Sequence, residues 1–255
     1  MLGLAKALNR ISYYDAAPND NPENFDLGFH FDIKPANILV SEDNVLQIAD
    51  FGQAKFKPND GSSRATHDGG TEDYAAPEFE AGPKGSKYDV WSLGCIFAEI
   101  FTFVLRSYPG VIDFEEKRAV CFDRRRKIKR YYDECPSSDR GSSQLMLKPA
   151  VQSWLEGLPE SNVGTSAEDL EFLKRIQKII LNMLVVDIRK RWMSTEVYQE
   201  LETLLDEVSV FDSNTQINPP VEPSAGTVGV GGEVLRNTRY VASFDFLNVV
   251  GKLSY

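Results

Sequence analysis

Residues 29–52, FHFDIKPANILVSEDNVLQIADFG, contain two short apolar runs, NILV and VLQIA, joined by the polar turn SEDN. This pattern predicts a β-hairpin. The hairpin would bring Asn37, at the start of the first run, close to Asp50 after the second, so two oxygen ligands could share a cation. Asp32 and Lys34 lie just before Asn37. A base, a lysine and two oxygen ligands at one place are what phosphoryl transfer requires, because that chemistry depends on positioning and charge neutralisation.

Four stretches resemble protein kinase motifs and occur in the family's order. HFDIKPAN (30–37) resembles the catalytic loop, and DFG (50–52) resembles the motif that opens the activation segment. GTEDYAAPE (70–78) is similar to the substrate-docking segment with its terminal APE motif, and DVWSLG (89–94) to the start of the central helix of the C-terminal lobe. The resemblance implies an α+β fold. It would be the mainly α-helical C-terminal lobe of the protein-kinase-like fold, with a short β-hairpin at the catalytic loop.

The resemblance also implies roles for five side chains. Asp32 matches the catalytic base, and Lys34 matches the lysine that contacts the transferring phosphate. A lysine followed by proline at this place is the serine/threonine form of the motif. Asn37 and Asp50 match the two Mg²⁺ ligands, whose oxygens suit that cation. Leu39 matches the residue that packs under the adenine ring of ATP, and a plain core leucine is the alternative.

Other matches are architectural. His30, Phe51 and Asp89 correspond to residues that hold the catalytic loop on the central helix. Thr71 corresponds to the docking-segment threonine that bonds to the catalytic aspartate and lysine. In the family, an arginine at the position of Arg191 pairs with the glutamate that matches Glu78.

Two features depart from the family pattern. Phe31 replaces the arginine that usually pairs with a phosphate on the activation segment, and phenylalanine cannot form such charge-assisted bonds. Phosphorylation of that segment at Ser62, Ser63 or Thr66 is therefore expected to matter less here. Nothing before residue 29 resembles a phosphate-covering glycine loop or a lysine-bearing strand, and GTVGVGGEV (226–234) does not fit the glycine-loop spacing.

The second departure sets the expected activity. The resemblance implies a serine/threonine protein kinase that transfers the γ-phosphate of ATP to protein hydroxyls, with Mg²⁺. The N-terminal lobe is expected to be missing, so the chain alone should bind ATP weakly and be inactive or weakly active. A partner polypeptide could supply that lobe. The alternative function is a non-catalytic, kinase-derived protein-binding module.

Hydrophobic periodicity predicts several helices. One covers residues 1–11, and residues 87–103 are apolar almost all round, which indicates a helix buried on every side. Thr165 and Glu168 form a capping-box pattern before an amphipathic helix that reaches residue 184, and another helix carries apolar residues up to 208. Residues 12–28 are predicted to be a surface loop.

The remaining stretches are predicted from their composition. Residues 109–159 are expected to be irregular, and their basic run 124–130 is interpreted as a solvated helix face, with a nuclear-import signal or a contact for acidic substrates as alternatives. A kinase-like lobe over residues 1–211 would be followed by a Pro/Gly-rich linker and tail over 212–255.

Composition narrows the partners and the compartment. The chain has 255 residues and a net charge of −10, which argues against generic nucleic-acid binding and against attachment to an anionic membrane. Its three cysteines have no CxxC spacing and indicate reduced thiols, and two histidines make a zinc site unfavourable. The sequence contains neither a recognisable signal peptide nor an uncharged apolar run long enough for a membrane span. A cytoplasmic or nuclear location is therefore expected.

Overall fold

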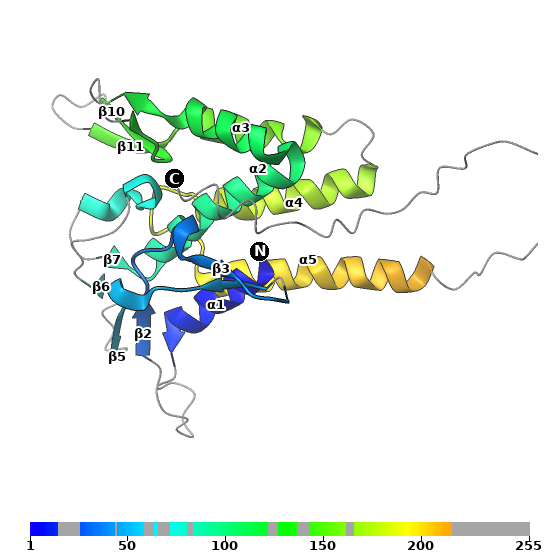
Figure 1. Ribbon diagram of the computed structural model, residues 1–255, viewed down its shortest axis with the longest axis horizontal. Helices are drawn as coiled ribbons and strands as arrows, with labels where there is room; N and C mark the ends of the chain where they lie inside the picture. The colour runs from blue at the N-terminus through cyan, green and yellow to red at the C-terminus, as the bar shows by residue number, and fades with distance from the viewer. Residues whose placement is uncertain are drawn as a thin grey trace, which may run out of the picture.

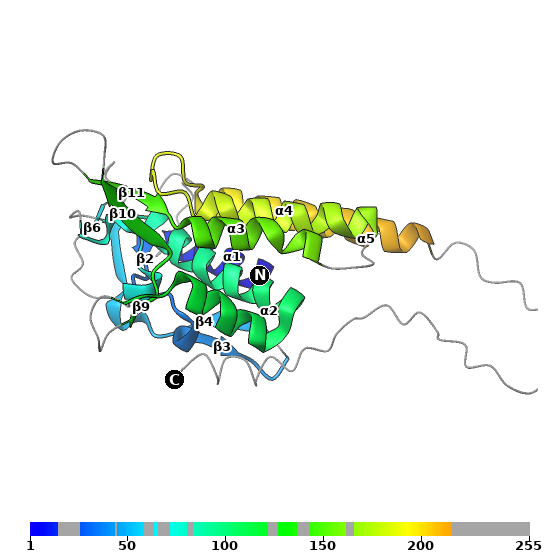
Figure 2. The same ribbon diagram turned by 90° about the horizontal axis from the view of Figure 1, so that it is seen from above.

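The computed structural model describes residues 1–14, 26–43, 45–58, 64–65, 72–80, 84–121, 127–136, 143–161 and 166–215. Five α-helices form most of the described structure, and the short strands gather mainly toward one end of them (Figure 1). The helices are α1 (Leu2–Ser12), α2 (Lys87–Arg118), α3 (Pro149–Gly157), α4 (Ala167–Met183) and α5 (Ser194–Thr215). Helix α2 packs against α3 and α4, and α5 packs against α1 and α4 (Figure 2).

The described strands form small antiparallel sheets. A three-stranded sheet has the order β1 (Tyr13–Tyr14), β2 (Asp26–Phe29), β5 (Lys55–Pro58). Four two-stranded sheets pair β3 (Ile38–Val40) with β4 (Leu46–Ile48), β6 (Arg64–Ala65) with β7 (Lys84–Gly85), β8 (Val120–Cys121) with β9 (Lys127–Ile128), and β10 (Tyr132–Pro136) with β11 (Ser143–Leu147). The predicted hairpin at residues 38–48 is confirmed. The surface-loop prediction for residues 12–28 is wrong at both ends. Ser12 is the buried last residue of α1 and is followed by β1, and β2 is largely buried between β1 and β5. Residues 15–25 lie outside the described residues.

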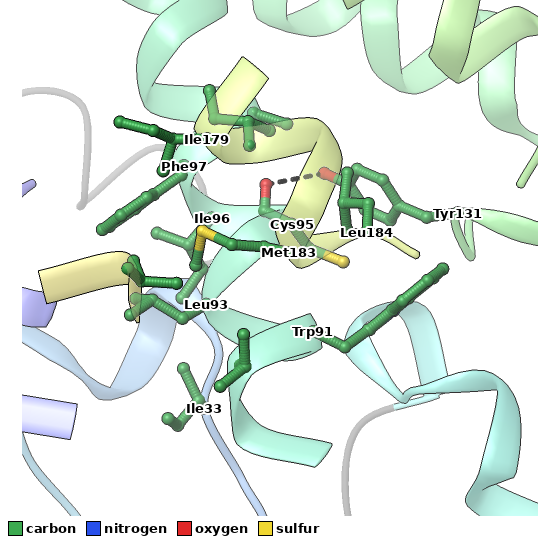
Figure 3. Close-up of a cluster of buried hydrophobic side chains, with 14 of the residues drawn as sticks. Ile33, Trp91, Leu93, Cys95, Ile96, Phe97, Tyr131, Ile179, Met183 and Leu184 are labelled. Carbon is green, nitrogen blue, oxygen red and sulfur yellow. Dashed lines mark hydrogen bonds between the residues drawn. The ribbon is translucent and has the colours of Figure 1, made fainter. Parts of the chain in front are cut away.

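Helix α2 is the centre of the hydrophobic core, as its all-round apolar sequence predicts. Figure 3 shows its side chains Trp91, Leu93, Cys95, Ile96 and Phe97 among Ile33, Tyr131, Ile179, Met183 and Leu184. Gly94 allows α4 to approach closely. A Cβ atom at Gly94 would lie 2.8 Å from Cβ of Met183 and 3.2 Å from Cδ2 of Leu184, closer than packed atoms normally come.

Helix α2 is interrupted after its buried half. Ser107 has φ 58° and ψ −171°, which is not helical, and Pro109 follows inside the helix. The prediction that residues 109–159 are irregular is therefore wrong for much of this range, because the second half of α2, the β10–β11 hairpin and α3 lie there. Of the basic run 124–130, the described part contains strand β9 rather than a helix, so the helix-face interpretation is wrong for that part.

One helix in the described residues, α2, is long and apolar enough to cross a membrane. Within its most apolar window, 78% of the residues are buried inside the protein. Glu99 lies in the same helix and forms buried hydrogen bonds. Helix α2 therefore matches the core helix of a globular fold.

The last two helices agree with the predicted periodicity, with one change in capping. Helix α4 is capped by Ser166, whose hydroxyl accepts a hydrogen bond from the amide of Asp169 at 3.0 Å. The predicted cap, Thr165, lies outside the described residues, so the cap assigned to it is one position too early. Helix α5 continues to Thr215, past the predicted boundary at residue 211. Residues 216–255, which include most of the predicted linker and tail, lie outside the described residues.

Candidate functional site

The side chains of Lys34 and Asn37 both contact one carboxylate oxygen of Asp32. Oδ2 of Asp32 lies 2.7 Å from Nζ of Lys34 and 3.1 Å from Nδ2 of Asn37. The same Asn37 nitrogen also donates to the carbonyl oxygen of Asp32 at 2.8 Å. Asn37 is buried, whereas the side chains of Asp32 and Lys34 are 11% and 26% exposed. The carboxylate of Asp32 thus lies beside the ammonium group of Lys34, and both side chains are partly exposed to solvent.

Local backbone chemistry creates this convergence. Pro35 begins a single 3₁₀ turn, Pro35–Asn37, where its fixed φ is favourable and its missing N–H costs nothing. The amide of Asn37 donates to the carbonyl of Lys34 at 3.0 Å, which closes the turn. The hairpin then begins, and the amide of Ala49 donates to the carbonyl of Asn37 at 2.9 Å. Asp50 therefore follows the residue that is hydrogen-bonded to Asn37.

Asp50 has an unusual backbone. Its φ of 62° is in the left-handed region, and its side-chain Oδ1 accepts a hydrogen bond from the amide of Gly52 at 3.2 Å. Phe31, next to Asp32, also has a positive φ, of 66°. Conformations of this kind cost about 1–3 kcal/mol each for residues other than glycine, and they concentrate at functional sites. Of the three such residues in the described chain, Phe31 lies just before Asp32 and Asp50 lies just after the hairpin, so two of them are at this site.

The loop is fixed to the central helix by Asp89. One carboxylate oxygen accepts from the amide of His30 at 2.7 Å, and the other accepts from the amide of Phe31 at 2.9 Å. Burial raises the pKa of Asp89 to about 6, although these two hydrogen bonds oppose the rise.

His30 connects the two motifs of the site. Burial lowers the pKa of His30, so its ring is neutral, with Nε2 donating to the carbonyl of Ala49 and Nδ1 accepting from the amide of Asp32. The ring of Phe51 meets the His30 ring edge-on, with 4.9 Å between centroids. The imidazole of His30 therefore joins residues 30–37 to the segment that contains the DFG motif, residues 50–52.

Phe31 is a buried aromatic residue. It stacks on Phe29, with ring centroids 5.2 Å apart, and meets Tyr88 edge-on at 5.7 Å. Phe31 is 1% exposed, so this position holds an aromatic ring packed in the core instead of the charged side chain that an arginine would bring. The candidate phosphorylated residues Ser62, Ser63 and Thr66, and the predicted docking threonine Thr71, lie outside the described residues.

Leu39 lies on strand β3, with 52% of its surface exposed. The alternative interpretation of Leu39 as an ordinary core leucine is therefore wrong. Phe51 is 46% exposed. Apolar surface is thus available beside the catalytic loop.

The oxygens near the hairpin suit a hard cation. The nitrogen end of the Asn37 amide faces Asp32, so the oxygen end is the one left for a metal, and Asp50 provides a carboxylate. No group of three or more His, Cys, Asp or Glu side chains that could hold a metal occurs in the described ranges. Mg²⁺ is commonly bound by one or two protein oxygens, substrate phosphates and water, so this donor set fits it.

Glu78 and Arg191 form the predicted ion pair. Nη1 and Nη2 of Arg191 lie 2.7 and 2.9 Å from the two carboxylate oxygens of Glu78. Arg191 also donates to the carbonyl oxygens of Val185 and Lys87, and its guanidinium lies 5.1 Å from the ring centroid of Trp91. The end of the docking segment is thereby fixed to the turn before α5.

A second polar cluster was not found from the sequence. It consists of Glu99 on α2 with Tyr74, Arg118 and Tyr131. Glu99 itself was a signal, because an acidic residue inside a helix that is apolar all round needs buried partners. No sequence pattern, however, indicated that Tyr74, Arg118 and Tyr131 would be the partners of Glu99.

Comparison with known proteins assigns a family. A family model described as the protein kinase domain matches residues 28–201. The serine/threonine-protein kinase NLK2 of Xenopus laevis is 47% identical over 73 residues, which are 28% of this chain and 16% of that protein. GLH-binding kinase 1 of Caenorhabditis elegans is 44% identical over 82 residues, 32% and 21% of the two chains. Cyclin-dependent kinase 20 of Homo sapiens is 42% identical over 89 residues, 34% and 25%.

The aligned stretches span at most about a quarter of these three relatives, whereas the family model covers most of the present chain. The matched region contains the catalytic loop, the hairpin, the docking segment and helix α2. This chain therefore belongs to the protein kinase family.

Proposed function

We propose that this site transfers the γ-phosphate of ATP to serine or threonine hydroxyls of proteins. The observation that carries the proposal is the contact of Oδ2 of Asp32 with both Lys34 and Asn37. Oδ2 of Asp32 thus lies beside the ammonium group of Lys34 and beside the side-chain amide of Asn37, the two groups that phosphoryl transfer would use. Asp32 is only partly exposed, so a substrate hydroxyl can reach it while its neighbours hold its orientation.

Each group of the site has a distinct role in this proposal. Asp32 orients the substrate hydroxyl and accepts its proton. Lys34 places positive charge where negative charge grows on the transferring phosphoryl oxygens. Asn37 and Asp50 would hold Mg²⁺ through their oxygens. The bound cation would neutralise charge on the phosphates of ATP.

We further assign residues 1–211 to the C-terminal lobe of the kinase fold, with residues 212–255 as a linker and tail. Leu39 would contact the adenine ring from one side. Because Leu39 is half exposed in this chain, the nucleotide would be held on one face only, and binding by these residues alone would be weak. A covering lobe, from the same protein or from a second polypeptide, would be needed for efficient transfer.

A non-catalytic binding module is the second candidate. Its supporting observation is the exposed apolar surface of Leu39 and Phe51 beside a docking segment that is fixed by Glu78 and Arg191. In that case a protein partner, rather than ATP, would cover this surface. A cytoplasmic or nuclear location suits both candidates, since Cys95 and Cys135 are free thiols.

A transfer assay separates the two candidates. The chain is incubated with MgATP labelled on the γ-phosphate and a mixed library of serine and threonine peptides. We expect slow incorporation that Asp32→Asn reduces by at least about a hundredfold, since general-base catalysis contributes about 10²–10⁴. Asp43→Asn, which removes an exposed carboxylate from the hairpin turn, is the matched control and should transfer normally. Equal incorporation by the Asp32→Asn variant would refute the proposed chemistry.

A further inference from the structure

The basic run 124–130 is a feature of the sequence that the proposed function does not use. Its residues, RRRKIKR, include six lysines and arginines in seven positions, in a chain whose net charge is −10. The described part, residues 127–130, contains strand β9, which pairs with β8, and leads directly into the hairpin β10–β11. A concentration of positive charge in an acidic protein favours an anionic partner at that place.

The end of this run lies against the docking segment. The main-chain amide of Lys129 donates a hydrogen bond to Oδ1 of Asp73 at 2.9 Å. Asp73 is the middle residue of the 3₁₀ turn Glu72–Tyr74, within the stretch that resembles the substrate-docking segment. Arg130, the next residue after Lys129, is therefore close to the surface on which a protein substrate would lie.

The cations beside Arg130 are used inside the protein, whereas Arg130 itself is not. Lys129 forms an ion pair with Glu115, and Nζ of Lys148 lies 3.5 Å from Oδ1 of Asp133. Among the residues that the structure describes, the guanidinium of Arg130 has neither an ion pair nor a hydrogen bond. Its N–H donors are therefore left for a group outside the described part of the chain.

The ring of Tyr132 supports the guanidinium of Arg130. The central carbon of the guanidinium lies 5.0 Å from the ring centroid. Tyr132 is 4% exposed and meets Trp91 edge-on at 5.9 Å, so this ring is part of the core. Arg130 is half-buried. A guanidinium stacked on an aromatic ring keeps its planar fork of N–H groups, and that fork matches the two oxygens of a carboxylate.

We propose that Arg130 binds a carboxylate of the protein substrate, so that this site selects substrate segments rich in aspartate and glutamate. The inference rests on the proposed function, because substrate selection has meaning only where a protein substrate docks. The position of Arg130 beside the docking segment favours a protein partner. The net charge of −10 opposes a nucleic acid, whose backbone is anionic along its whole length.

Peptide binding to the full chain tests this preference without any need for phosphate transfer. A fluorescent peptide carries a serine flanked on both sides by glutamates, a second peptide has glutamine at those places, and fluorescence anisotropy measures both dissociation constants. We expect the glutamate peptide to bind at least about tenfold more tightly. Arg130→Gln should weaken its binding by about tenfold, as for the loss of hydrogen bonds to a charged group, and leave the glutamine peptide unchanged. Lys178→Gln, which removes an exposed cation from α4, is the matched control and should change neither constant.

A second variant separates charge from geometry. Arg130→Lys keeps the positive charge and loses the planar fork, so it should weaken binding of the glutamate peptide by a smaller factor than Arg130→Gln does. If transfer is measurable, Arg130→Gln should raise the KM for the glutamate peptide by about tenfold and leave the KM for MgATP unchanged. Equal effects on both constants indicate a structural role and overturn the proposal.

The remaining outcomes separate this inference from the proposed function. Equal binding of the two peptides by the unaltered chain overturns the proposed preference, and so does unchanged binding of the glutamate peptide in both Arg130 variants. Equal weakening by Lys178→Gln shows only general attraction between charges and also overturns it. Tighter binding of a single-stranded oligonucleotide than of the glutamate peptide, lost in Arg130→Gln, would assign the basic run to nucleic acid instead. A preference for glutamate that depends on Arg130, with no transfer by the unaltered chain, refutes only the proposed catalytic activity.

Discussion

The guanidinium of Arg191 donates two parallel hydrogen bonds to the carboxylate of Glu78, a residue 113 positions earlier in the chain. The Arg191 side chain is completely buried, and Glu78 is 16% exposed. Because the pair joins the end of the docking segment to the turn before α5, it connects the surface proposed for substrate docking with the helical core.

Arg191→Ala should strongly destabilise the protein. It leaves the carboxylate of Glu78 without its partner and the carbonyl oxygens of Val185 and Lys87 without a donor. Loss of one member of such a pair costs about 3–5 kcal/mol in the free energy of unfolding. Chemical denaturation measures this quantity. Arg189→Ala is the control, because the Arg189 side chain is 85% exposed and forms its ion pair with nearby Asp187. An Arg191→Ala variant as stable as the control would show that the pair has no structural role.

Gly94→Ala should destabilise the contact between α2 and α4. The added methyl group would be 2.8 Å from Cβ of Met183, and neither helix can move without disturbing the core. Overpacking of this kind costs about 1–3 kcal/mol. Gly157→Ala, at the end of α3, places its methyl group where no atom of the described residues, apart from its chain neighbours and its own helix backbone, lies within 4 Å, and it should be neutral or slightly stabilising. Similar melting temperatures for the two variants would contradict the close approach of the helices.

Sequence reasoning worked best where the relevant residues are close in the chain. Asp32, Lys34 and Asn37 lie in one turn, so local backbone chemistry brings them together. Helices α1, α2, α4 and α5 follow from apolar periodicity because each buries one continuous face, or all of its surface in the case of the first half of α2. The Glu78–Arg191 contact, in contrast, was anticipated only from the family resemblance.

The features that were missed depend on contacts between distant or weakly patterned segments. Strands β2 and β5 are four residues each, and their pairing is not encoded in either strand alone. Helix α2 is broken at Ser107 and then continues to Arg118 although Pro109 lies inside it, so its second half did not follow from the pattern. Arg118 lies in a stretch without a motif, so its contact with Glu99 could not be read from the sequence. Helix α3 had one overlooked signal, Pro149 at its first turn.

Asp89 should make the stability of the protein depend on pH. Its pKa is about 6 in the folded protein and 3.8 as an exposed group, so folding takes up a proton on Asp89 between those values. The contribution of Asp89 to the free energy of unfolding therefore increases as pH falls through this window, by up to about 3 kcal/mol. Other carboxylates titrate too, so the measured quantity is the stability of the unaltered protein minus that of Asp89→Asn. This difference should be larger near about pH 4 than at about pH 7. A constant difference would contradict the raised pKa.

The most direct test of the central claim is a thermal-shift titration of the full chain with ATP, with and without Mg²⁺, for the unaltered protein, Asp50→Asn and Asp43→Asn. The proposed site predicts stabilisation only at roughly millimolar nucleotide, since one face of the nucleotide is uncovered. The shift should require Mg²⁺, be lost in Asp50→Asn and persist in Asp43→Asn. Stabilisation at micromolar nucleotide would contradict the expected weak binding. A shift that survives Asp50→Asn, or that needs no Mg²⁺, would contradict the proposed site itself.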